Sequence, residues 1–147
     1  MYSAHRMARF IISWCNQRHM PVTNLKLQKL LYFIQGEYAR SCDERLIQDD
    51  FYAWQLGPVI PDVYFKYSIF SSSAIPTIKH ENEEDIPQQV VIHLDDILRK
   101  YARYSTWTLV DMSHAQDPWK YNYQIFGDKS LISYESIYKY FREATKH

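Results

Sequence analysis

Residues 109–119 contain the side chains that come nearest to a catalytic arrangement. Ser113 precedes His114, and Asp111 and Asp117 lie close by in the sequence. A serine, a histidine and a carboxylate can act as nucleophile, general base and orienting group of a hydrolase. Residues this close along a chain rarely reach the geometry of a triad, whose members usually come from separate segments. A small hydrolase that uses His114 is therefore the disfavoured interpretation.

The same residues suit a joint between two helices, and this interpretation is favoured. An imidazole at His114 would meet the last carbonyl groups of one helix, where the helix dipole favours positive charge. Asp117 and Pro118 are typical of the first residues of the next helix. Trp119 would then pack across the joint and need a partner for its indole N–H.

The sequence contains no familiar metal or nucleotide motif. It has neither a His-x-x-x-His pair nor a Cys-x-x-Cys pair. The possible ligands are scattered along the chain: His5, His19, His80, His93, His114, His147, Cys15 and Cys42. Three glycines are too few to build a phosphate-binding loop or a dinucleotide fingerprint. The sequence therefore predicts no metal site and no cofactor.

Two amphipathic helices are predicted at the start of the chain. The first covers residues 3–18 and has Ser3 as its N-cap, and the second covers residues 25–40 and is capped by Thr23 or Asn24. The apolar residues of the second recur at helical spacing: Leu27, Leu30, Leu31, Ile34 and Tyr38. They form a stripe that must be buried, so we expect the two helices to pack as a hairpin.

A rigid corner follows, and we define it as residues 54–64. Residues 51–59 are expected to be extended or β, because aromatic residues are frequent in strands. Gly57 lacks a Cβ, and Pro58 fixes its own φ and keeps Gly57 out of the helical region. The chain must therefore turn here, and Pro61 is well placed to begin the next helix.

The second half of the chain is predicted to be helical after a mobile acidic loop near residues 79–89. That loop carries four carboxylates and Pro87, which favours a solvated segment. Further helices are expected over residues 95–104, residues 106–113, from Pro118 onward, and over residues 134–144 with Ser133 as N-cap.

Composition limits the fold class and the compartment. A chain of 147 residues fits one domain, so residues 1–147 are predicted to form a compact, mostly α bundle with one short extended segment. The formal charge is zero, which gives no global field toward nucleic acid or an anionic membrane. Two cysteines without a disulfide framework favour a reducing, cytoplasmic location, and no apolar run is long enough for a membrane span.

Aromatic residues make up 16% of the chain, more than a core of this size requires. Core packing is favoured for any single tryptophan, including Trp54 and Trp107. Taken together, the aromatic residues still predict some exposed surface that recognises a partner. Aromatic rings interleaved with lysine and arginine also allow nucleic-acid binding. Because the chain has no net positive charge to attract phosphates, we rank that function below protein binding.

Two blocks in a fixed order resemble the Panacea domain, the SocA-like antitoxin family that is also found in phage-associated proteins. The first block is N-L-K-L-Q-K-L-L-Y-F at residues 24–33. The second is A-W at residues 53–54 with G-P-V at residues 57–59, followed by Pro61 and V-Y at residues 63–64. Ser113-His114 and Pro118-Trp119 complete the resemblance, which extends over nearly the whole chain.

The resemblance implies a non-enzymatic antitoxin that neutralises a cognate toxin protein by direct binding. It also allows a proteolytic adaptor that delivers the toxin to a ClpXP-type protease. A nucleic-acid-binding regulator and a hydrolase remain the alternatives. The corner and the motif together supply the candidate partner-binding residues, which are Trp54, Gly57, Pro58, Tyr64, His114 and Trp119. A stiff corner would lose little conformational entropy on binding.

Overall fold

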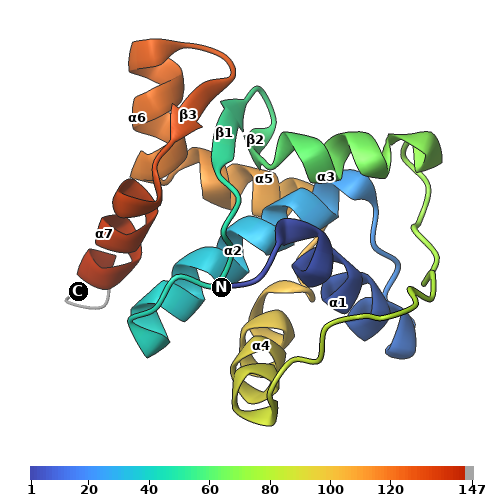
Figure 1. Cartoon of the computed structure of the whole chain (residues 1–147). Helices are drawn as coiled ribbons and strands as arrows, with labels where there is room; N and C mark the ends of the chain where they lie inside the picture. The colour runs from blue at the N-terminus through green and yellow to red at the C-terminus, as the bar shows by residue number, and fades with distance from the viewer. Residues whose placement is uncertain (145–147) are drawn as a thin grey trace.

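Helix α2 (Asn24–Cys42) lies at the centre of the molecule, and the other helices surround it (Figure 1). The structure is a computed structural model that describes residues 1–144. The other helices are α1 (Ala4–Gln17), α3 (Pro61–Lys66), α4 (Gln88–Tyr101), α5 (Thr106–His114), α6 (Asp117–Phe126) and α7 (Tyr134–Ala144), with a 3-10 turn η1 (Ser68–Phe70) after α3. This arrangement confirms the predicted mostly α bundle.

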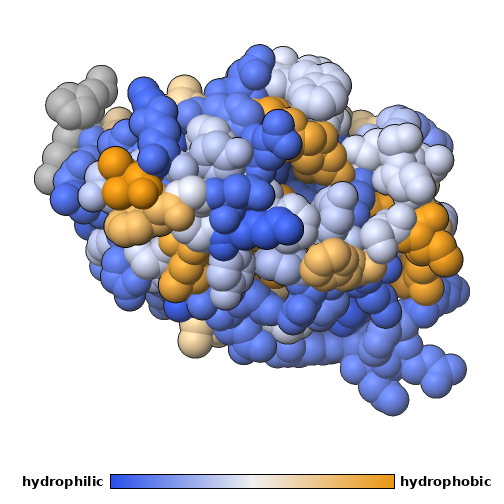
Figure 2. All heavy atoms as spheres, turned by 90° about the horizontal axis from the view of Figure 1, so that it is seen from above, coloured by the Kyte–Doolittle hydropathy of each residue, from blue (hydrophilic) through white to orange (hydrophobic). Residues whose placement is uncertain are grey.

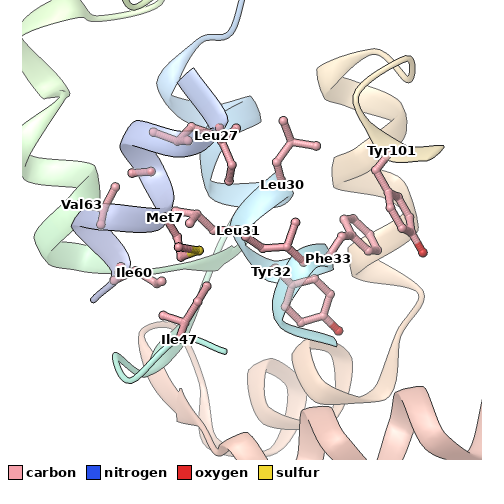
Figure 3. Packing of buried hydrophobic residues seen from close by; sticks show 14 of the residues in the cluster. Met7, Leu27, Leu30, Leu31, Tyr32, Phe33, Ile47, Ile60, Val63 and Tyr101 are labelled. Atoms are coloured by element: carbon pink, nitrogen blue, oxygen red, sulfur yellow. The ribbon is translucent and has the colours of Figure 1, made fainter. Parts of the chain in front are cut away.

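Helix α2 is buried nearly all round and not along one stripe only. It packs against α1, α4, α5 and α7, so residues on every side of it are covered. Leu27, Leu30 and Leu31 are fully buried, and Phe33 stacks on Tyr101 of α4 with 4.4 Å between the ring centroids (Figure 3). The single apolar face predicted for this helix was therefore too narrow, because a helix enclosed by four others has no solvent face.

The predicted N-caps are confirmed at three helices. Ser3 Oγ accepts from the Arg6 amide at 3.1 Å, and Thr23 Oγ1 accepts from the Lys26 amide at 3.3 Å. The third cap is Ser133, whose Oγ accepts from the Ser136 amide at 3.2 Å. Each hydroxyl pairs with an N–H group that has no partner within its own helix.

A three-stranded antiparallel sheet lies beside the helices, with the strand order β2-β1-β3. Strands β1 (Phe51–Trp54) and β2 (Gly57–Val59) form a hairpin whose turn is Gln55 and Leu56, which confirms the predicted β segment. Strand β3 (Ser130–Ile132) was not predicted. It has three residues and pairs with a strand about 80 positions earlier, so no local pattern marks it.

Helix α4 begins at Gln88, seven positions before the predicted start at residue 95. The expectation that residues 88 and 89 belong to the acidic loop was therefore wrong. Val90 and Leu94 pack into the core, and this tertiary contact favours helix where the polar composition favoured a loop. In the remainder of that loop, Glu83 pairs with Arg6 and Arg9 of α1. The mobility of the segment stays a prediction.

Gly36 is required where α2 meets α7. A Cβ built at Gly36 would overlap the buried ring of Phe141. Gly36→Ala should therefore lower the free energy of unfolding by at least about 1 kcal/mol, even though alanine gains about 1 kcal/mol in helix propensity. Urea unfolding measures this change. The double variant Gly36→Ala/Phe141→Leu should recover part of the loss, and an undiminished stability of Gly36→Ala would contradict this packing.

Candidate functional site

Three polar side chains of α2 hold the backbone of the corner. Asn24 donates from Nδ2 to the carbonyl of Tyr64 at 2.9 Å. Gln28 accepts at Oε1 from the Ile60 amide at 3.0 Å and donates to Asn24 Oδ1 at 3.1 Å. The Lys29 ammonium donates from Nζ to the carbonyl of Pro58 at 2.5 Å. These bonds fix the corner on α2, because a buried backbone group without a hydrogen-bond partner destabilises the folded state.

Gln35, about two turns after Gln28 on α2, holds the backbone that precedes the hairpin. Its amide donates to the Ile47 carbonyl and accepts from the Ile47 N–H, both at 2.9 Å. The four polar residues of α2 were not among the predicted site residues. The signal that could have identified them is the presence of amides and an amine inside an apolar helix, since buried polar groups need specific partners.

Lys29 and Gly57 are packed against each other. The Lys29 side chain is fully buried, and desolvation lowers the pKa of its ammonium from 10.5 to about 7. Gly57 has φ +112°, and a Cβ added there would lie 2.8 Å from both Lys29 Cε and Ser113 Oγ. Position 57 therefore requires glycine for two reasons. Its backbone conformation is one that other residues rarely adopt, and the surrounding atoms leave no space for a side chain.

His114 of α5 and Trp119 of α6 hold the backbone at the turn of the hairpin. His114 Nε2 lies 3.0 Å from the carbonyl of Gln55, and Trp119 Nε1 donates to the carbonyl of Trp54 at 2.7 Å. Their rings stack with centroids 4.1 Å apart. Since a carbonyl only accepts, His114 must carry its proton on Nε2. Trp119 thus packs at the joint between α5 and α6, as predicted.

The geometry around His114 does not form a triad. Ser113 is buried, and its hydroxyl donates to the carbonyl of Val110 at 2.8 Å. Nε2 of His114 is directed to Gln55. Both functional groups are thus used to bind backbone carbonyls, which suits support of the hairpin and not proton transfer between the two.

Three aromatic rings lie together at the corner, and we call them the outer rings: Trp54, Tyr64 and Phe65, the residue that follows the corner. Trp54 contacts Tyr64 edge to face at 5.1 Å between centroids and contacts Phe65 at 6.0 Å. Trp54 and Tyr64 are half-buried, whereas 62% of Phe65 is exposed. Seen from the side of the hairpin and α3, hydrophobic side chains form separate patches among hydrophilic ones (Figure 2). Phe65 was not predicted as a site residue.

The six predicted partner-binding residues thus fall into two groups. Trp54, Tyr64 and His114 reach the surface. Gly57, Pro58 and Trp119 are buried and position the backbone from within. Their part in binding stays a prediction. Core packing was the wrong expectation for Trp107, which lies in the first turn of α5 and is 61% exposed.

An open groove lies next to the outer rings. It has a volume of about 600 Å³ and runs between the hairpin turn, α3 and the first turns of α2 and α5. Trp54, Tyr64 and Trp107 line it together with Leu56 of the turn. We call this feature the hairpin groove.

The described residues include no group of three or more histidine, cysteine, aspartate or glutamate side chains arranged to hold a metal. His147 lies outside the described residues.

Both cysteines are free thiols, and burial raises the pKa of Cys15 to about 11, so this thiol is a poor nucleophile. In residues 1–144, no helix has the combined length and apolar character that crossing a membrane demands.

Comparison with known proteins agrees with the geometry. The family model described as antitoxin SocA-like, Panacea domain, matches residues 27–120, which include most of α2, the corner, His114 and Trp119. The chain is also 32% identical over 129 residues to the antitoxin SocA of Caulobacter vibrioides (strain NA1000 / CB15N), an alignment that covers 79% of this chain and 68% of that protein. No solved structure matches the chain. The chain belongs to the SocA-like antitoxin family, whose defining unit is the Panacea domain.

Proposed function

We propose that this protein is an antitoxin that neutralises a protein toxin by direct binding, and that the outer rings of the corner contact the toxin. The observation that carries the proposal is the exposure of Phe65 beside Trp54 and Tyr64, on a backbone held by hydrogen bonds from α2 and α6. Aromatic side chains dominate the energetic centres of protein interfaces. A fixed backbone also loses less entropy on association than a flexible loop does.

The test compares two phenylalanines of similar exposure on different elements. Phe65, which directly follows the corner in α3, is 62% exposed, and Phe126 at the end of α6 is 66% exposed. Cells would express the product of the adjacent reading frame together with this chain or a variant of it. We expect Phe65→Ala to weaken binding of that product by about tenfold or more and to lose protection, because interface anchors contribute about 2 kcal/mol.

Phe126→Ala is the matched control and should protect as well as the wild type does. Equal protection by both variants would contradict the assignment of the corner as the contact surface. If no complex forms between the purified wild-type chain and the adjacent product, neutralisation by direct binding is wrong for that pair. Both variants remove an exposed ring, so their stability should change by no more than about 0.5 kcal/mol.

Delivery to a ClpXP-type protease requires the same binding step followed by degradation. The protection assay in cells that lack this protease separates the two modes. Direct neutralisation predicts full protection and an undegraded complex. Protection that disappears in these cells would assign the chain as a proteolytic adaptor.

Catalysis by His114 is tested by His114→Gln. Glutamine retains an N–H group that can donate to the Gln55 carbonyl but has no imidazole to transfer a proton. The present geometry, in which His114 supports the hairpin turn, predicts that protection is retained. Complete loss of protection by a folded variant that still binds the toxin would favour the hydrolase.

A further inference from the structure

The hairpin groove differs in charge from a second groove of the molecule. None of the thirteen residues that line it is charged. The second groove, of about 440 Å³ between α1 and α4, has six charged residues among thirteen: Arg6, Arg9, Arg18, Glu83, Asp95 and Asp96. Since 23% of the chain is charged, an uncharged surface groove is a specific feature that a partner must match.

We propose that the hairpin groove binds an uncharged, mainly apolar peptide segment of the partner protein. The inference rests on the proposed function and specifies the chemistry of the segment that docks. A charged side chain placed in this groove would lose hydration without an opposite charge in its walls, which is costly. An apolar side chain would instead cover Trp54, Leu56 and Trp107 and remove their apolar surface from water.

Hydroxyl groups of the groove suit the backbone of such a segment. Ser71, Ser72 and Thr106 line the groove, and each hydroxyl can both donate and accept a hydrogen bond. They can therefore pair with the N–H and C=O groups of a peptide without adding a charge. A largely apolar site with a few neutral polar groups is typical of specific recognition.

Further exposed apolar side chains lie beside the groove residues, which favours a protein segment over a small molecule. Phe65 and Ile69 are 62% and 82% exposed, and each is next in sequence to a lining residue, Tyr64 or Ser68. A ligand that filled only the groove would leave these side chains in water. A segment that belongs to a larger surface would cover them as well.

A random-peptide display library selected on the immobilised, full-length chain tests the proposal without knowledge of the toxin. We expect the enriched peptides to be rich in aromatic and aliphatic residues and poor in charged ones. Their affinity should be nearly constant between about 50 and about 500 mM salt, because screening affects only charge–charge attraction. Selection of a charged consensus, or a steep fall of affinity with salt, would overturn the proposal.

Substitutions in the hairpin groove test whether the selected peptides bind there. Trp107→Ser and Leu56→Ser should each weaken a selected peptide by about tenfold, as expected for contacts in the centre of an interface. Tyr121→Ser is the control, since Tyr121 is 59% exposed on α6 and does not line the groove. If the control weakens the peptides as much as Trp107→Ser does, the groove is not their site and the proposal is wrong.

Sedimentation of the peptide-free chain tests the competing occupant, a second copy of the chain. A dimer that Trp107→Ser disrupts would overturn the proposal, and a monomer supports it.

Failure of the inference remains distinguishable from failure of the proposed function. If Phe65→Ala loses protection while selection yields only charged peptides, direct neutralisation stands and the apolar segment is rejected.

Discussion

Replacement of Gly57 by alanine should lower the free energy of unfolding by about 3 kcal/mol or more. Two costs add at this position. A non-glycine residue at φ +112° is strained by about 1–3 kcal/mol. The new methyl group would also lie 2.8 Å from Lys29 Cε and Ser113 Oγ and 2.9 Å from Lys29 Nζ, and overpacking of this kind costs a further 1–3 kcal/mol or so. Urea unfolding followed by circular dichroism measures the sum.

Gly127→Ala is the matched control, because it separates strain from crowding. Gly127 also has a positive φ, +92°, but a Cβ added there would meet no atom within 4 Å. Its substitution should therefore cost only the backbone strain. If the two variants lose the same stability, the contact of Gly57 with Lys29 and Ser113 contributes nothing, and our account of this packing fails.

The effect of Gly57→Ala should extend to function. The amine of Lys29 holds the Pro58 carbonyl, so displacement of Lys29 by a new methyl group would release the backbone that carries Trp54 and Tyr64. We expect weaker toxin binding even at a temperature where the variant is still folded. Isothermal titration measures this loss, with the complex of the wild-type chain and the toxin as reference. Unchanged affinity would show that the corner takes no part in toxin recognition.

The second prediction concerns Lys29 and pH. Folding should become more favourable by about 2 kcal/mol between pH 7 and about 8.5, since a full one-proton difference contributes about 1.4 kcal/mol per pH unit. The pKa of Lys29 is about 7 in the folded protein and 10.5 without burial. Between these values the unfolded chain holds a proton that the folded chain has released. Stability therefore rises with pH in this window, and the contribution of Lys29 becomes constant only well below pH 7, where both states hold the proton.

The window ends near pH 8.5 because another group acts in the opposite direction above it. Burial raises the pKa of Cys15 from 9.0 to about 11, so the unfolded thiol loses its proton first and stability falls as pH increases through that range. Urea midpoints measured at several pH values from 6 to about 8.5 isolate the contribution of Lys29.

Lys29→Met should remove the slope, because methionine fills similar space and does not titrate. Lys26→Met is the control. Lys26 also donates to a backbone carbonyl, that of Ala102 at 2.7 Å, but it is only partly buried. Burial lowers the pKa of Lys26 as well, yet the slope between pH 7 and 8.5 should persist in this variant. A slope that survives in Lys29→Met would show that another group causes it.

Local signals in the sequence were sufficient for most of the secondary structure. The caps at Ser3, Thr23 and Ser133 and the positive φ of Gly57 before Pro58 depend on neighbours within a few positions, although the turn itself lies at Gln55 and Leu56, just before the predicted place. Their physical causes, a hydroxyl near free N–H groups and a restricted φ, are contained in the residues themselves. The paired blocks around α2 and the corner likewise indicated the family before any fold was known.

The site required long-range contacts that no local pattern encodes. Lys29 lies 29 positions from the carbonyl it binds, and Trp119 lies 65 positions from its own. Helix propensity and periodicity predict that α2 is a helix, but they do not predict which backbone groups its buried amides and amine meet. Those pairings follow from the packing of α2 among four helices and a hairpin. Burial then makes each polar partner necessary, because a group removed from water must be satisfied within the protein.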